Sequence, residues 1–247
     1  MKIYNKKRVC IVNTLFLIYL FQHFSSKIGT LVANTFDYEI IDKYNVFAWL
    51  SIHHIVQTLL ALVPIYILSK TLNIDFGFKL GDKKIGIKYV KIFTMAMLAY
   101  ITITAFISYL SNQIVQYDYP LTYTNILGSL SFQLFFSGPS EEILFRALPI
   151  SIITYLIPSE KGVKMRKLHI SWAIIISAVF FALAHIKWTV NPFSVSIDCM
   201  QLLFSLVLGI MYGIVYQKSK SVIYPMIMHS FTNVAVVGAG YILSIVK

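Results

Sequence analysis

Charged residues are scarce in this sequence. Only 13% of its 247 residues are Asp, Glu, Lys or Arg, only ten are acidic, and 57% are hydrophobic. Soluble domains typically contain about 25% charged residues, and the mean hydropathy of +0.73 departs from their composition in the same direction. The composition therefore excludes an ordinary water-soluble domain and indicates a chain that uses the lipid bilayer as its solvent.

Cysteine pairs and common catalytic signatures are also missing. The two cysteines, Cys10 and Cys199, have no CxxC spacing, which excludes a zinc ribbon and argues against a disulfide framework. The sequence contains neither HExxH nor GxSxG, so it does not favour a zincin or a serine hydrolase. A catalytic site, if the chain has one, must be built from other residues.

Seven long apolar runs are present instead, most of them close to the ~20 residues that a helix needs to cross a bilayer. We predict an all-α fold, a polytopic transmembrane helix bundle with about seven spans, as a single integral membrane domain over residues 1–247. The first run follows a basic segment but precedes no small-residue cleavage site, so we interpret it as a retained helix. The fourth contains Gly138-Pro139, which predicts a kink, a split or a re-entrant piece there. The runs are residues 9–32, 46–69, 90–115, 124–157, 169–188, 198–217 and 222–246.

Basic residues are unevenly divided between the loops. With a cytoplasmic N-terminus, the cytoplasmic segments hold 16 of the 21 lysines and arginines, the outer segments hold four, and Arg146 lies inside a helix. This bias follows the positive-inside rule and predicts a multi-pass protein of the cell membrane with a cytoplasmic N-terminus. The net charge of +11 comes from basic residues that lie in short blocks between the apolar runs. Because these residues do not form one basic face, we predict no nucleic-acid partner.

Three ionisable residues lie deep in the fourth apolar run: Glu141, Glu142 and Arg146. A charged side chain at the bilayer centre costs about 2.5–3.5 kcal/mol on insertion scales, so intramembrane charges usually pair or serve a function. Glu142 and Arg146 have i,i+4 spacing and can form an ion pair, whereas Glu141 points about 100° away. A purely architectural pair would explain Glu142 and Arg146 but not Glu141, which we therefore predict to be functional.

Two of the six histidines lie within or at the end of apolar runs near the C-terminus. His185 ends the run 177–185, and His229 lies inside the last run, four residues before Asn233. A lone helical histidine is more often a satisfied core residue, but an intramembrane glutamate pair makes a functional role more probable for both. We interpret the other four as interfacial or loop histidines: His23, His53, His54 and His169.

These side chains together indicate hydrolysis. A carboxylate and a histidine can hold and deprotonate a water, while a second histidine and an amide can stabilise an oxyanion. The same carboxylate and histidines could instead bind a divalent metal such as zinc that activates the water, with Glu141, His185 and His229 as ligands.

Three motifs in this region resemble those of a known family. Residues 141–146 match EExxxR, residues 181–185 match FxxxH, and residues 229–233 match HxxxN. Their order and spacing resemble the CPBP family, the CAAX proteases and bacteriocin-processing enzymes also called Abi or Rce1-like. The match covers about residues 138–235, whereas the N-terminal half shares only its apolar character.

The resemblance implies an Rce1-like core and roles for individual residues. Glu141 would be the general base, and His185 would help to hold the water. His229 and Asn233 would form the oxyanion site, and Phe181 would shape the substrate pocket. Glu142 and Arg146 would support the site. Family members have been described both as metalloproteases and as proteases with a glutamate-activated water, so the resemblance leaves the metal open.

The resemblance also suggests a partner. Family substrates range from prenylated CAAX proteins to bacterial leader and signalling peptides, and the compact chain looks bacterial. We therefore expect a peptide or membrane-protein substrate, reached within the lipid bilayer, and maturation of a peptide such as a quorum-sensing signal. Two alternatives remain: a non-enzymatic immunity or scaffolding factor, and a proton-coupled transporter, although no internal repeat is visible.

Overall fold

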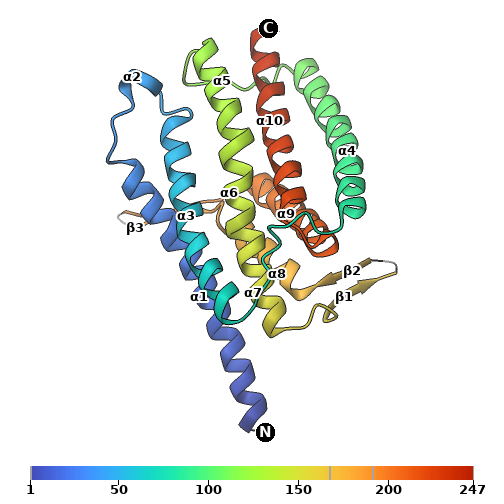
Figure 1. Cartoon of the computed structure of the whole chain (residues 1–247). Coiled ribbons are helices and arrows are strands. Elements are labelled where there is room, and N and C mark those ends of the chain that lie inside the picture. The colour runs from blue at the N-terminus through green and yellow to red at the C-terminus, as the bar shows by residue number, and fades with distance from the viewer. Residues whose placement is uncertain (1, 167, 191, 247) are drawn as a thin grey trace.

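The computed structural model describes residues 2–166, 168–190 and 192–246 and shows a helical bundle (Figure 1). Two antiparallel hairpins interrupt its loops, β1 with β2 and β3 with β4. The full-length helices are α1 (Lys2–Ala33), α3 (Ala48–Thr71), α4 (Lys83–Leu110), α9 (Cys199–Ser219) and α10 (Ile223–Val246), with short helices α2 (Glu39–Asp42) and α8 (Trp172–Leu183) and the strands β1 (Gly162–Met165), β2 (Leu168–Ser171), β3 (Lys187–Val190) and β4 (Phe193–Ser196).

The starts of four helices are fixed by side-chain caps. The oxygen of an Asp, Thr or Ser accepts a hydrogen bond from a backbone N–H of the first turn, which otherwise lacks a partner. This need is acute in a bilayer, where no water can satisfy the free donors. The capping residues are Asp82 for α4, Thr122 for the helix beginning at Tyr123, Ser171 for α8 and Asp198 for α9.

The fourth apolar run forms one continuous helical rod over residues 123–156. It consists of α5 (Tyr123–Phe132), α6 (Gly138–Glu142) and α7 (Leu148–Leu156), joined by two π-helical segments, η1 (Gln133–Ser137) and η2 (Ile143–Ala147). Each π segment precedes a proline, Pro139 or Pro149, which has no N–H to donate to the preceding turn. The chain therefore widens its turn at both places, and the predicted split near residue 138 is a π bulge and not a re-entrant loop.

Side chains from other helices bind the carbonyl groups of the rod at these bulges. Ser230 Oγ donates to Leu134 O at 2.8 Å, Gln22 Nε2 donates to Leu144 O at 2.9 Å, and Ser177 Oγ donates to the carbonyl of Phe145. Because an unpaired carbonyl is costly in a bilayer, these contacts tie α10, α1 and α8 to the rod.

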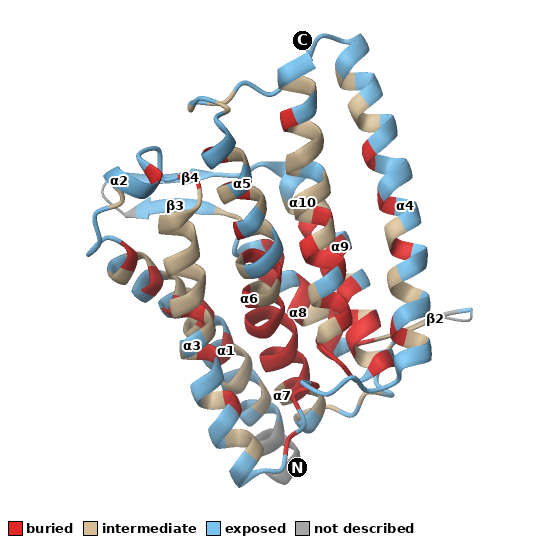
Figure 2. Cartoon of the chain, turned by 45° about the horizontal axis from the view of Figure 1, so that its top comes forward, coloured by how far each residue is buried: buried red, intermediate tan, exposed pale blue. Residues whose placement is uncertain are grey.

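The helices pack around this rod in a definite order. In Figure 1, α1 packs on α3 at one edge, α10 lies between α6 and α4, and α8 and α9 pack on each other. A Cβ at Gly138 would come within 2.6 Å of Ser230 Oγ, so glycine permits the close approach of α6 and α10. The buried residues gather on α6, α7, α8 and the adjacent part of α9 (Figure 2), which places the core beside the glutamate pair.

The helical segments match the predicted fold class, with one correction. Five helices are long and apolar enough to cross a membrane: residues 8–33, α3, α4, α9 and α10. The predicted fifth span, 169–188, is wrong as a full-length helix, because only the 12 residues of α8 are helical and strands flank it on both sides. At 1.5 Å per residue α8 covers about 18 Å, which is well short of the hydrocarbon core.

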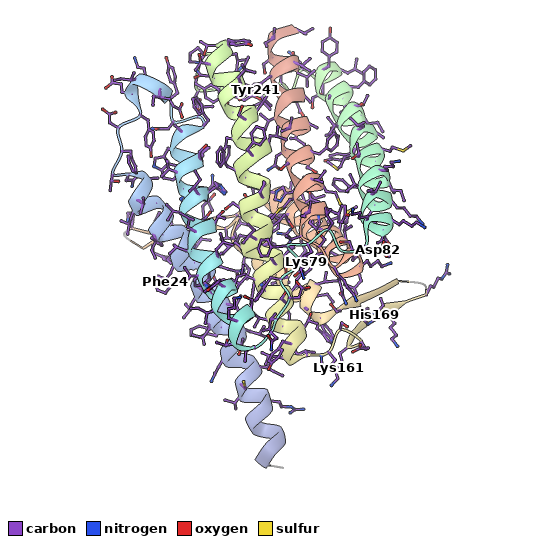
Figure 3. The ribbon with its side chains drawn as sticks, in the orientation of Figure 1. Phe24, Lys79, Asp82, Lys161, His169 and Tyr241 are labelled. Atoms are coloured by element: carbon purple, nitrogen blue, oxygen red, sulfur yellow. The ribbon has the colours of Figure 1, made fainter. Side chains whose placement is uncertain are left out.

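The connections divide between the two ends of the bundle. The N-terminal part of α1, the 72–82 loop, the β1–β2 hairpin and the α9–α10 turn lie at one end, and α2 and the α4–α5 connection lie at the other. Figure 3 places Lys79, Asp82, Lys161 and His169 toward the first end and Tyr241 toward the second. The basic segments predicted to be cytoplasmic thus share one end, so we keep the prediction of a cytoplasmic N-terminus. Lys167 and Lys247 lie outside the described residues.

We expect the two ends to face opposite sides of the membrane. In a Cys10→Ser/Cys199→Ser background, a membrane-impermeant maleimide should label Lys43→Cys in intact cells and label Lys161→Cys only after permeabilisation. Both lysines are exposed and lie at opposite ends. The reverse labelling pattern would contradict the predicted orientation.

Candidate active site

All the residues predicted for the site converge at the middle of the bundle. The glutamates lie on α6, Arg146 lies on η2, Phe181 lies on α8 with His185 just beyond its end, and His229 and Asn233 lie on α10. Ring contacts connect the two histidines, because the centroid of Phe181 lies 4.8 Å from that of His185 and 5.9 Å from that of His229. Segments 40 to 90 residues apart in sequence therefore meet at one place.

Glu142 and Arg146 form a fully buried ion pair. Both side chains are 0% exposed, and Arg146 Nε lies 3.3 Å from Glu142 Oε2. The guanidinium carbon lies 4.1 Å from the centroid of the Phe181 ring and 5.5 Å from that of Tyr212. Aromatic faces attract a cation and replace part of its lost hydration, so Arg146 is held by one carboxylate and two rings.

His229 lies between the two carboxylates. Its Nδ1 is 2.7 Å from Glu142 Oε1, and its Nε2 is 3.7 Å from Glu141 Oε2. Tyr212 stacks on the imidazole with ring centroids 5.1 Å apart, which fixes the ring plane. Since Nδ1 donates to Glu142, the opposite nitrogen is directed at Glu141.

Glu141 is the carboxylate that remains accessible. Its side chain is 20% exposed, whereas that of Glu142 is completely buried. Ser137 Oγ donates to Glu141 Oε1 at 3.3 Å, and Asn233 Nδ2 donates to the same serine oxygen at 3.0 Å. One N–H of Asn233 therefore acts on Glu141 through Ser137, a contact that the three motifs do not contain.

His185 is oriented by the helix that precedes it. Its Nδ1 lies 2.8 Å from the carbonyl oxygen of Phe181, one helical turn earlier. A carbonyl only accepts, so the proton sits on Nδ1 and Nε2 keeps a lone pair. That lone pair is available to a water or a substrate group.

A cavity of about 420 Å³ leads to Glu141. It runs between α1, α3, the rod and the segment after α8, and its wall includes polar side chains that are unusual in transmembrane helices. The polar lining comprises Gln22, His23, Ser26, Lys27 and Thr30 of α1, His53, His54 and Gln57 of α3, and Glu141, His185 and Lys187.

Several of these residues were missed by the sequence interpretation. His23, His53 and His54, interpreted there as interfacial, line the cavity with Glu141. His53 and Gln57 have i,i+4 spacing, so one helix face carries both, and that pattern could have indicated a polar wall. Ser137 also stands four residues before Glu141, but a helical serine usually bonds its own backbone and gave no signal.

The donor set does not form a metal site. Within residues 2–166, 168–190 and 192–246, no three His, Cys, Asp or Glu side chains are placed to hold one ion. Glu141, His185 and His229 lie in the same region but are not arranged as the ligands of a tetrahedral zinc site. The metal stays a prediction from the family resemblance, and no step below uses it.

We expect Arg146→Ala to destabilise the protein strongly, because it leaves the buried Glu142 without its cation. Breaking one partner of a buried pair typically costs about 3–5 kcal/mol. The apparent Tm of purified protein in detergent should fall, and Glu142→Gln added to Arg146→Ala should recover part of the loss. A double variant no more stable than Arg146→Ala would contradict this account.

One comparison with known proteins found a match. A family model described as type II CAAX prenyl endopeptidase Rce1-like matches residues 123–235, from the start of α5 to the middle of α10. No curated protein and no solved structure was found to match the chain. The matched segment contains all six polar site residues and Phe181. The chain therefore carries, over residues 123–235, an Rce1-like domain of the CPBP family of membrane proteases.

Proposed function

We propose that the protein is a glutamate-dependent intramembrane endopeptidase in which Glu141 activates the attacking water. The observation that carries this proposal is the different environment of the two adjacent carboxylates. Glu142 is sealed between Arg146 and His229, whereas Glu141 reaches the cavity and is held by Ser137. A buried, paired carboxylate is structural, and an accessible one can accept a proton.

The proposed reaction uses only side chains of this chain. Glu141 takes a proton from a water that His185 Nε2 orients, and the oxygen attacks the scissile carbonyl carbon. In this proposal His229 carries a proton on both ring nitrogens, so Nδ1–H stays on Glu142 while Nε2–H donates to the oxyanion. The second N–H of Asn233, whose first N–H binds Ser137, donates to the same oxyanion. When the C–N bond breaks, Glu141 returns its proton to the leaving amine, so the carboxylate is regenerated.

The substrate in this proposal is a bacterial signalling or leader peptide, such as a quorum-sensing precursor. A cavity of about 420 Å³ admits a few extended residues and not a folded domain. Its mixed lining suits the polar backbone of a peptide, because backbone groups brought into a bilayer need hydrogen-bond partners.

We expect Glu141→Gln to abolish cleavage while the protein accumulates normally. General-base catalysis typically contributes about 10²–10⁴-fold, and glutamine cannot accept the proton. The measurement is mass spectrometry of candidate peptides incubated with protein in liposomes. Glu160→Gln, which removes an exposed loop carboxylate, is the matched control.

The same variant separates the enzyme from the two alternatives. If Glu141→Gln gave the same peptide products as the wild type, or if the cellular phenotype persisted in this variant, the hydrolytic proposal would be wrong. Either result would favour an immunity or scaffolding role. Substrate flux through reconstituted protein without cleavage would favour a transporter.

We expect Ser137→Ala to lower kcat by about tenfold, in line with the loss of one hydrogen bond to a charged group, and to leave KM nearly unchanged. Ser137 positions Glu141 and does not touch the substrate, so the effect should fall on the chemical step. Ser151→Ala is the matched control, because this buried serine lies on α7 and bonds Tyr216 instead. An equal loss of activity in both variants would show that Ser137 has only a packing role.

A further inference from the structure

The catalytic cavity has a basic mouth that the proposed chemistry does not use. Lys27 of α1 and Lys187 at the start of β3 both line the cavity, and both side chains are exposed. Among the described residues that line the cavity, Glu141 is the only carboxylate, against two lysines. Positive groups therefore outnumber negative ones along the path to Glu141.

The mouth is an ordered structure. The ring of Trp188 stacks on that of His23, with centroids 5.2 Å apart and an interplanar angle of 17°. Lys27 Nζ lies 5.5 Å from the centroid of the same tryptophan. Pairing of Lys187 with Ser196 and of Trp188 with Val195 holds the strand that carries these side chains. The ammonium groups are thus presented by a helix and a hairpin that contact each other through Trp188.

Neither ammonium group forms an ion pair with a residue that the structure describes. The ion pairs among the described residues involve Glu141, Glu142, Arg146 and His229, and none includes Lys27 or Lys187. Two unpaired cations at a cavity mouth attract an anion, and a narrow cleft focuses their field.

We propose that Lys27 and Lys187 form a subsite that binds a carboxylate of the peptide substrate, close to the bond that Glu141 hydrolyses. This proposal rests on the proposed endopeptidase function and adds that the enzyme prefers peptides with a carboxylate near the scissile bond. The carboxylate is supplied by an Asp or Glu side chain or by the peptide's C-terminus, because both present the same group to the lysines.

The position of the mouth also assigns the side of substrate access. Lys27 and Thr30 lie near the C-terminal end of α1, His53 lies near the N-terminal end of α3, and Lys187 follows α8. In Figure 1 the C-terminal end of α1 and the N-terminal end of α3 lie on the side of α2, away from the N-terminus and the β1–β2 hairpin. With a cytoplasmic N-terminus, the acidic peptide reaches the site from the outer face of the membrane.

The test is cleavage of a synthetic peptide library by protein in detergent, followed by mass spectrometry. Each peptide is supplied with a free and with an amidated C-terminus, which separates the two sources of the carboxylate. The proteins are wild type, Glu141→Gln, Lys27→Glu, Lys187→Glu and the double variant of the two lysines. Lys43→Glu is the matched control, because it makes the same charge change at the same end of the bundle outside this cavity.

The wild type should cleave peptides with an acidic residue or free C-terminus near the scissile bond in preference to neutral and basic ones. Each single lysine variant should reduce that preference by about fivefold, the effect of one exposed charge pair, and the double variant should favour basic peptides. Lys43→Glu should keep the wild-type preference.

Two other outcomes are distinguishable. Glu141-dependent cleavage with no acidic preference, or with a preference that Lys43→Glu changes as much as Lys27→Glu does, overturns the subsite and leaves the protease intact. Cleavage that persists in Glu141→Gln, or no cleavage by the wild type, overturns both proposals.

Discussion

The buried charge of Arg146 is the constraint on which the rest of the site depends. A guanidinium with no exposed surface needs a carboxylate and polarisable neighbours, and here Glu142, Phe181 and Tyr212 supply them. These partners come from α6, α8 and α9, and Glu142 in turn binds His229 of α10. Satisfying one charge therefore brings four helices together, and the helices carry the remaining site residues with them.

The two prolines of the rod impose a second constraint that acts in the same direction. Each π bulge leaves carbonyl groups that lack a regular partner within the rod, and a bilayer offers no water to replace it. Ser230, Gln22 and Ser177 bind carbonyls there from three other helices. Because the bulges flank the two glutamates on both sides, the hydrogen bonds to these carbonyl groups also fix the depth and rotation of the segment that carries the glutamate pair.

The sequence could predict the parts of this structure that depend on local spacing. The i,i+4 relation of Glu142 to Arg146 and the apolar runs follow from helix periodicity and bilayer thickness. The length of α8 could not be predicted in this way, because apolar side chains such as Ile170, Ile186 and Trp188 extend the run beyond both ends of the helix. The role of His54 could not be predicted either, since only the packing of α3 against the rod brings its ring into the cavity that holds Glu141. Ser137 acts through a contact between α10 and the rod, which no motif spacing encodes.

Two adjacent carboxylates in one helix turn can have different roles only if their surroundings differ. Helix geometry places the two side chains in different surroundings. Successive side chains diverge by about 100°, so one faces Arg146 in the core and the other faces the cavity. The core carboxylate keeps His229 in place, and His229 then faces the cavity carboxylate at 3.7 Å. Water must reach that second carboxylate through a bilayer, which requires a polar path, and the histidines and glutamines of α1 and α3 provide it. The N-terminal helices, which carry none of the family motifs, thus make a buried charge cluster accessible. In the proposed protease, the polar residues of these helices are therefore where substrate choice can change without altering the chemistry.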